Sequence, residues 1–310
     1  MLFPHGSIDF FYFIIFPGFA FTVVVGLLST WVDRKVSARI QWRVGPPWYQ
    51  PFADVAKLMG KETIVTERSS RMTFLVAPFI GFAAIILVST IVWLANIYPG
   101  SSFVGDLIVV VYLLYLPSIA LIIAGSSSRN PFGALGASRE MKLMLAYEVV
   151  FLFAIFTVVV KNGGIISLGG ILDYQASHGA MLSQGASCII AFIVALLYMP
   201  AKLGIVPFDI PEAETEIIAG PYTEYSGAIL AIFKLTKAML LFTLPIFVLT
   251  LFAKTVWTPW TILWYLLILV FIILVKNTNP RVRIDQALKV FWLPMLGLSI
   301  LGIILAAVGL

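Results

Sequence analysis

Apolar runs of about 20 residues recur along this chain, and each is long enough to cross a lipid bilayer as a helix. In composition, 61% of the 310 residues are hydrophobic and only 11% are charged, whereas a soluble domain carries roughly 25% charged residues. The sequence therefore predicts an all-α membrane protein, a bundle of about eight transmembrane helices in which residues 1–310 form one transmembrane domain. The predicted spans, the seventh beginning near Trp257, are approximately residues 8–32, 73–98, 104–124, 141–160, 184–203, 227–252, 260–275 and 290–309.

Several kinds of catalytic site are excluded by scarce residue types. The chain has a single Cys, Cys188, so it cannot form an intrachain disulfide or ligate an iron–sulfur cluster by itself. Its two His, His5 and His178, lie far apart and lack metal-ligand spacing. Neither a Gly-rich phosphate loop nor a nucleophile motif occurs. We therefore expect no cofactor, metal or complete active site in this chain, and any redox centre on a partner.

The positive charges divide the loops into two classes. Most of the 20 Lys and Arg residues lie in loops that follow the first, third, fifth and seventh spans, whereas the opposite loops carry only Lys161 and Lys254. By the positive-inside rule, the odd-numbered loops are cytoplasmic and both termini lie outside. Membrane orientation thus explains the net charge of +5 without nucleic acid. We predict a multi-pass protein of the cell membrane that contacts lipid.

The first cytoplasmic loop contains a short amphipathic pattern. Phe52, Val55 and Met59 follow helical spacing, while Asp54 and Lys57 fall on other faces. This pattern predicts a short amphipathic helix along the membrane surface. A rigid Gly-Pro-Pro turn and interleaved aromatic residues precede it, more than orientation alone requires. We therefore favour the interpretation that this loop docks a protein partner. In the alternative, the loop charges only set the membrane orientation and the helix only lies on the lipid surface.

A carboxylate lies inside the fourth predicted span. Glu148 is surrounded by apolar residues, and an intramembrane carboxylate is a functional-site hypothesis because burying its charge is unfavourable. Glu140 precedes it on the same helical segment, so the two could relay a proton through water. The alternative is a structural ion pair of Glu148 with Arg139 or Lys142.

The loop after the fifth span concentrates acidic residues on the side that should be positive. It contains one lysine, Lys202, and five carboxylates, Asp209, Glu212, Glu214, Glu216 and Glu224. Clustered carboxylates repel one another when charged, which suits them to hand protons on. Glu212 and Glu216 are spaced so that they would face each other on a helix. The alternative is a solvated acidic loop, which its apolar flanking residues disfavour.

Two lysines, Lys234 and Lys237, lie within the sixth span on one helical face. Buried lysines need carboxylate partners or a wet path. The nearest carboxylates in sequence are Glu224 and the acidic cluster at 209–216.

Four motifs together resemble the NADH dehydrogenase subunit 1 family, the eight-helix membrane subunit at the heel of respiratory complex I and of its hydrogenase-type relatives. They are the QxRxGP and KLxxKE elements within 39–62, the segment 126–148, PFDIPEAExE with EYSG at 207–227, and RxRxDQ at 281–286. The resemblance extends over essentially the whole chain.

The resemblance implies a coupling role. The family carries a peripheral electron-transfer arm on its cytoplasmic loops and couples redox chemistry to ion translocation by antiporter-like membrane subunits. Iron–sulfur clusters would lie on peripheral partner subunits, and a NiFe-type centre could accompany them. Mapped onto this sequence, the ion path is Glu140, Glu148, Asp209, Glu212, Glu214, Glu216, Glu224, Lys234 and Lys237. The residues expected to dock the arm are Arg34, Arg39, Arg43, Asp54, Lys57, Lys61, Glu62, Arg129, Arg281 and Arg283.

Two departures from the family pattern bear on the electron acceptor. Quinone-reducing members usually carry an acidic residue and an arginine just before PFD, where this chain has Lys202 and Ile205. The Gly45-Pro46-Pro47 turn is more similar to that of membrane-bound hydrogenase and archaeal sulfur-reducing relatives. Those relatives pass ferredoxin electrons to protons or sulfur compounds without quinone.

We therefore expect an anchoring and coupling subunit of a redox-driven proton or sodium pump with ferredoxin-type electron input. The retained EYSG and EAETE motifs keep a quinone-binding role open as an alternative. A stand-alone ion transporter that uses the same charges is a third possibility, which the docking loops disfavour.

Overall fold

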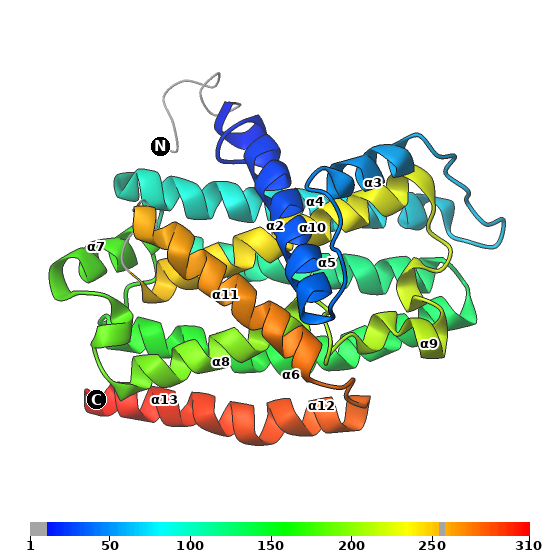
Figure 1. Cartoon of the computed structure of the whole chain (residues 1–310). Helices are drawn as coiled ribbons and strands as arrows, with labels where there is room; N and C mark the ends of the chain where they lie inside the picture. Colours follow the sequence, from blue (N-terminus) through cyan, green and yellow to red (C-terminus); the bar gives the residue numbers. More distant parts are fainter. Residues whose placement is uncertain (1–10, 254–257) are drawn as a thin grey trace.

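The computed structural model describes residues 11–253 and 258–310, which form a bundle of helices (Figure 1). His5, the start of the first predicted span, Lys254 and the expected helix start near Trp257 lie outside these residues. The helices are α2 (Phe19–Ile40), α3 (Gln50–Met59), α4 (Arg71–Ile97), α5 (Asp106–Ser127), α6 (Pro131–Lys161), α7 (Leu168–His178), α8 (Ala186–Lys202), α9 (Glu214–Ile217), α10 (Gly227–Phe252), α11 (Pro259–Thr278), α12 (Ile284–Val290) and α13 (Leu296–Val308). Short 3-10 turns are η1 (Pro99–Ser101), η2 (Met181–Ser183), η3 (Ile210–Glu212) and η4 (Gly220–Tyr222), and η5 (Phe291–Met295) is a π-helical turn.

The predicted membrane bundle is confirmed. Seven helical stretches among the described residues are long and apolar enough to cross a membrane, and the shorter apolar helix α8 accompanies them. The predicted start of the fourth span is ten residues late, because α6 already begins at Pro131. There the Asn130 side chain accepts a hydrogen bond from the Phe132 amide as an N-cap, and proline suits the first helical position. Glu140 and Glu148 therefore share one continuous helix.

Helix α10 forms the centre of the bundle. It is apolar on nearly all faces, and 94% of its most apolar stretch is buried, as expected of a helix that is hydrophobic all round. It packs against α2, α3 and α4. Figure 1 shows α2 and α11 crossing the longer, roughly parallel helices at a steep angle. This arrangement places the sixth span, with its two lysines, beside most of the functional elements described below.

The predicted amphipathic helix is present as α3. Its Phe52 and Val55 pack against Leu27 of α2 and Leu235 and Ala238 of α10. Part of the face that the sequence assigns to the membrane surface is therefore covered by protein.

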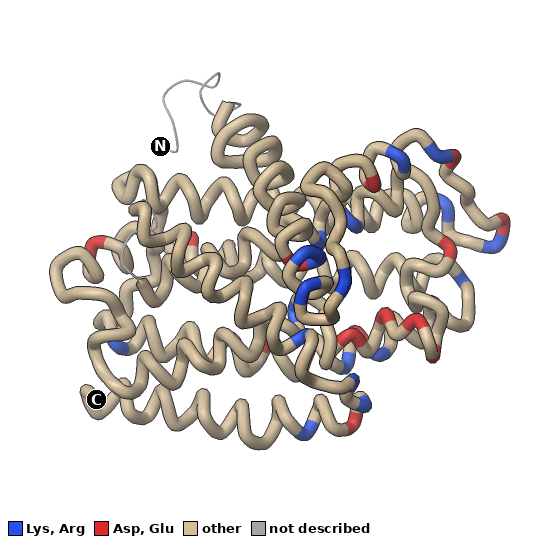
Figure 2. The backbone as a smooth tube through the Cα atoms, in the orientation of Figure 1, with Lys and Arg blue, Asp and Glu red and all other residues tan. Residues whose placement is uncertain are grey.

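Charged residues gather at one end of the bundle, as Figure 2 shows. That end contains α3, α9 and the segment between α8 and α10. The helix expected to pair Glu212 with Glu216 does not form, because η3 ends at Glu212 and the single turn of α9 begins at Glu214. The two carboxylates consequently bind different cations: Glu212 binds Lys237, and Glu216 binds Arg139.

Candidate functional site

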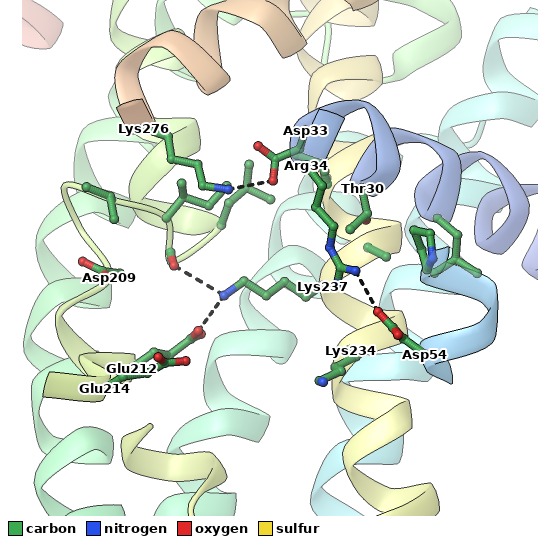
Figure 3. Close-up of a pocket in the computed structure, with 18 of the residues that line it drawn as sticks. Thr30, Asp33, Arg34, Asp54, Asp209, Glu212, Glu214, Lys234, Lys237 and Lys276 are labelled. Carbon is green, nitrogen blue, oxygen red and sulfur yellow. Dashed lines mark hydrogen bonds and ion pairs between the residues drawn. The ribbon is translucent and has the colours of Figure 1, made fainter. Parts of the chain in front are cut away.

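The larger part of the site is a charged cavity of about 450 Å³ at this end of the molecule (Figure 3). Its walls are α2, α3 and α10, the segment that follows α8, and two cations at and beyond the end of α11, Lys276 and Arg281. Apolar side chains such as Leu27, Val55 and Leu241 line it together with the charges. Helices and loops that are far apart in sequence thus meet around one cavity.

Four ion pairs surround this cavity, each with an N–O separation of 2.7 Å. The pairs are Arg34–Asp54, Lys276–Asp33, Lys237–Glu212 and Arg281–Asp209. Their side chains remain partly exposed, so each pair contributes only about 0–1 kcal/mol to stability. The hydrogen bond from the Arg34 guanidinium holds the pKa of Asp54 below its usual value. The cavity is therefore strongly polar yet nearly balanced in charge.

Lys237 leads from this cavity into the bundle. Its ammonium binds Glu212 and also donates to the carbonyl of Gly204, 3.4 Å away. Gly204 has a φ of +57°, and a Cβ there would lie 3.2 Å from Glu212 Oε1. Glycine thus satisfies both the left-handed backbone and the close approach of the carboxylate.

A smaller cavity of about 50 Å³ lies behind the Lys237–Glu212 pair. Ser118, Glu140, Lys202 and Thr236 line it, together with both members of the pair. A polar cavity needs only ~10–15 Å³ to hold a water molecule. Its size and lining therefore allow water to bridge the Lys237–Glu212 pair and Glu140.

A chain of hydrogen bonds continues from Glu140 into the bundle. The hydroxyl of Tyr147 donates to Glu140 Oε1 (3.1 Å) and lies 3.0 Å from Ser118 Oγ. Ser118 Oγ in turn accepts from Lys202 Nζ at 3.4 Å. Every link can donate toward Glu140, so the chain forms a directed connection between Lys202 and that carboxylate.

The inner end of the chain is a buried ion pair between Lys202 and Glu148. The Lys202 side chain has no exposed surface, and that of Glu148 is 8% exposed. Tyr198 donates a further hydrogen bond of 3.1 Å to Glu148 Oε2. Removing one member of a buried pair leaves an uncompensated charge, so the two residues depend on each other.

The structure brings together only part of the ion path expected from the sequence. Glu140, Glu148, Glu212 and Lys237 form the route just described, and Glu214 and Asp209 line the charged cavity. Lys234 also lines that cavity, with an exposed side chain. The remaining two lie elsewhere: Glu216 binds Arg139 at the surface, and Glu224 accepts from Asn130.

Two expectations about partners are corrected, and one alternative finds another partner. The ion pair considered as the alternative for Glu148 is formed with Lys202 on α8, not with Arg139 or Lys142 on its own helix. Lys234 is not buried, because its face of α10 borders the open cavity. Glu224 does not pair with either lysine of α10, because its carboxylate is held by Asn130 at 2.5 Å.

The residues expected to dock a partner separate into two groups. Arg34, Asp54 and Arg281 form ion pairs at the charged cavity. The others are exposed, namely Arg39, Arg43, Lys57, Lys61, Glu62, Arg129 and Arg283. Trp42 and Val44, next to Arg43 in the first loop, are also almost fully exposed. In this loop, exposed cations thus accompany exposed apolar side chains, a combination typical of a binding surface, whereas Arg129 and Arg283 lie on other loops.

Sequence reasoning missed several side chains of the route. Lys202 ends an apolar run and was expected in the acidic loop, whereas it is buried at the end of α8. Ser118 and Tyr147 carry no motif, and only the packing of α5 on α6 brings them together. Asp33 and Lys276, far apart in sequence, pair because α2 packs on α11. Within the part of the chain that the structure describes, no three His, Cys, Asp or Glu side chains are grouped to hold a metal ion.

Comparison with known proteins gives one consistent match. The family described as NADH dehydrogenase matches residues 13–307. One subunit of the NADH-quinone oxidoreductase of Dehalococcoides mccartyi is 33% identical over 93% of this chain and 84% of its own length. The corresponding subunit of Thermomicrobium roseum is also 33% identical, over 91% of each chain. A chain of the membrane-bound sulfane sulfur reductase, an archaeal respiratory membrane complex, superimposes with a TM-score of 0.83 at 29% identity, covering 92% of this chain and 96% of that one.

Proposed function

The chain belongs to the NADH dehydrogenase family, and from that premise we propose that it anchors a peripheral electron-transfer arm and couples it to ion translocation. The observation that carries this proposal is the polar route from the charged cavity to the buried Lys202–Glu148 pair. Apolar residues of similar volume often stabilise an interior as well as a buried ion pair does, so the buried Lys202–Glu148 pair favours a functional role.

The route would transmit charge by linked ion pairs. A change of charge at the mouth of the cavity acts on the half-exposed Lys237–Glu212 pair, which can rearrange at little energetic cost. Water in the smaller cavity would carry a proton between Glu212 and Glu140, and Tyr147 and Ser118 connect Glu140 to Lys202. Protonation of Glu148 would leave Lys202 uncompensated, and in the low-dielectric interior that change is strongly felt by Glu140.

For the peripheral partners, we propose ferredoxin-type electron input with protons or sulfur compounds as acceptor. The structural likeness to a chain of a sulfane sulfur reductase supports this reading, as do Lys202 and Ile205 before the PFD motif. The exposed cations and Trp42 of the first loop would dock hydrogenase-like and iron–sulfur subunits, which would hold the redox centres. Antiporter-like membrane subunits would move protons or sodium, with the charged end of the bundle cytoplasmic and both termini outside.

A quinone-binding role is the second candidate, favoured by the 33% identity to NADH-quinone oxidoreductase subunits. The cavity has apolar walls that could hold a lipophilic ring. Four ion pairs around it make a poor lining for an uncharged lipid tail, which is why we place this role second.

The test uses the intact complex, purified through a tag on this chain and reconstituted in liposomes with reduced ferredoxin. We expect Glu148→Gln and Glu212→Gln to assemble and to abolish most ion translocation. Unchanged ion translocation in both variants would contradict the proposed coupling role. Robust, inhibitor-sensitive reduction of a quinone analogue would instead favour the quinone-binding role, whereas proton or polysulfide reduction alone supports the first.

A further inference from the structure

A third cavity, of about 390 Å³, borders the ion pair of Lys237 and Glu212 (Figure 3). Its walls are α10 and the segment that runs from η3 to η4. The pair therefore lines three cavities, since it also lines the charged cavity and the smaller cavity behind it. The residues around the third cavity are Glu212, Glu214, Ala219, Tyr222, Leu230, Phe233, Lys234 and Lys237.

The third cavity has a different lining from the charged cavity. The two share one wall, formed by the Lys237–Glu212 pair and by the exposed residues Glu214 and Lys234. The other three ion pairs of the charged cavity contribute no residue to the third one. A partner that binds those three pairs would therefore leave the far side of this wall in contact with water.

A strained turn bounds the third cavity. Ile218 and Ala219, between α9 and η4, have φ angles of +49° and +65°, and Ala219 lines the cavity. A left-handed backbone costs roughly 1–2 kcal/mol at each residue that carries a Cβ. The Thr223 hydroxyl holds the turn by donating to the carbonyls of Ile218 (2.6 Å) and Gly220 (2.8 Å). Such strain is concentrated at functional sites, so it favours a functional role for the cavity beside this turn.

The third cavity reaches the buried route at Glu212. Tyr222 and Phe233 line both the third cavity and the smaller one, with their rings in edge-to-face contact and their centroids 5.2 Å apart. Besides these two rings, both cavities share the Lys237–Glu212 pair. Its carboxylate can take up a proton from water in one cavity and release it to water in the other. Because Glu140 lines the smaller cavity, that proton reaches the route without entering the charged cavity.

We propose that the third cavity is a separate entrance through which protons from bulk water reach Glu212. This inference rests on the proposed coupling function. Hydronium in the third cavity gives its proton to the Glu212 carboxylate and becomes water. The carboxyl group then protonates water in the smaller cavity, which regenerates the carboxylate and its pair with Lys237. The charged cavity is left to respond to the docked arm, and its occupation does not interrupt the supply of protons.

An introduced cysteine tests whether bulk water reaches this cavity in the intact complex. Leu230 is half-buried and lines the third cavity but neither of the other two. Cys188, the one cysteine of the chain, is buried. A membrane-impermeant, water-soluble thiol reagent therefore reports on Leu230→Cys, and the mass of this chain measures the modification.

We expect Leu230→Cys to be modified in the intact, reconstituted complex. Modification should slow ion translocation at least about 10-fold relative to the unmodified variant, because a positioned proton-transfer group contributes about 100-fold or more. The matched control is Lys289→Cys, at an exposed site on α12 outside the three cavities, which should be modified without slowing. No modification of Leu230→Cys, or modification without slowing, would overturn the entrance.

A second variant tests whether the entrance is separate. Val55 lines the charged cavity and not the third one, so Val55→Trp narrows the charged cavity alone. We expect Leu230→Cys to be modified at the same rate with and without Val55→Trp. A much lower rate in the double variant would mean that the reagent arrives through the charged cavity, which would overturn the proposal.

Glu148→Gln in the same preparation distinguishes this proposal from the coupling function. If Glu148→Gln blocks translocation while modified Leu230→Cys pumps at its unmodified rate, the entrance is overturned and the coupling function stands. If Glu148→Gln also pumps normally, the coupling function itself fails.

Discussion

The charged cavity and the buried chain behind it use the same residue types in opposite physical settings. In the Arg34–Asp54 pair of the cavity, 40% and 30% of the two side chains are exposed, whereas Lys202 has none of its side chain exposed. Water screens the first kind, so these pairs can break and re-form easily. The interior does not screen the second, so its charges are fixed to one another. A molecule that responds to charge at its exposed end and transmits that response through its interior needs both exposed and buried ion pairs.

The largest expected effect is at the buried pair. Lys202→Met leaves Glu148 without its cation. We expect the free energy of unfolding to fall by about 3–5 kcal/mol. If Glu148 becomes neutral instead, it can no longer take part in charge transfer. Thermal unfolding of the purified complex measures the loss. Lys289→Met, at an exposed site on α12, is the matched control and should change the stability little. Equal effects of the two substitutions would erase the contrast between buried and exposed charges.

The next effect tests the hydrogen-bonded chain. Tyr147→Phe keeps the ring but removes the hydroxyl between Ser118 and Glu140. We expect about 1–3 kcal/mol of destabilisation from the unsatisfied buried groups, and ion translocation slowed by at least about 100-fold. Tyr265→Phe, which loses a buried hydrogen bond to Ser29 outside the route, should destabilise similarly without that slowing. If both variants slow pumping equally, the chain has no special role.

A smaller effect is expected where the two regions meet. Gly204→Ala forces a side chain onto a left-handed backbone and toward Glu212, so we expect about 1–2 kcal/mol of destabilisation. The displaced Glu212–Lys237 pair should also slow pumping. Gly297→Ala in α13, where an added Cβ meets nothing within 4 Å, should instead be neutral or stabilising by up to about 1 kcal/mol. If Gly204→Ala changed neither stability nor pumping, the backbone at Gly204 and the Glu212–Lys237 pair would be able to shift without loss of function.

Much of the fold is predictable from the sequence, because a long apolar run directly indicates a helix that crosses the lipid bilayer. Helix ends are less predictable, since α6 starts at an Asn130 cap that lies outside the apolar run. The site likewise has a part that the sequence predicts and a part that it does not. Glu148 and the Lys237–Glu212 pair follow from charges placed inside or beside a span. The Ser118–Tyr147 contact joins residues 29 positions apart by helix packing, which local sequence does not encode.

The smallest effect concerns the pH response of the exposed region. Because the Arg34 guanidinium holds the pKa of Asp54 below its usual value, the bridge contributes its stability above the normal range of an aspartate, about pH 4. That contribution is lost as the pH falls through the lowered pKa of the folded state. The exposed geometry limits it to at most about 1 kcal/mol.

Asp54→Asn should therefore be less stable than the wild type by this small amount at pH 7, and the difference should vanish in acid. Denaturant titrations of the complex at neutral and acidic pH, with and without added salt, measure it. Salt should reduce the neutral-pH difference, because half-exposed charges are screened within a Debye length. A large, salt-insensitive difference would mean that Asp54 behaves like Glu148, and the charged cavity would then be a rigid part of the buried route rather than its responsive end.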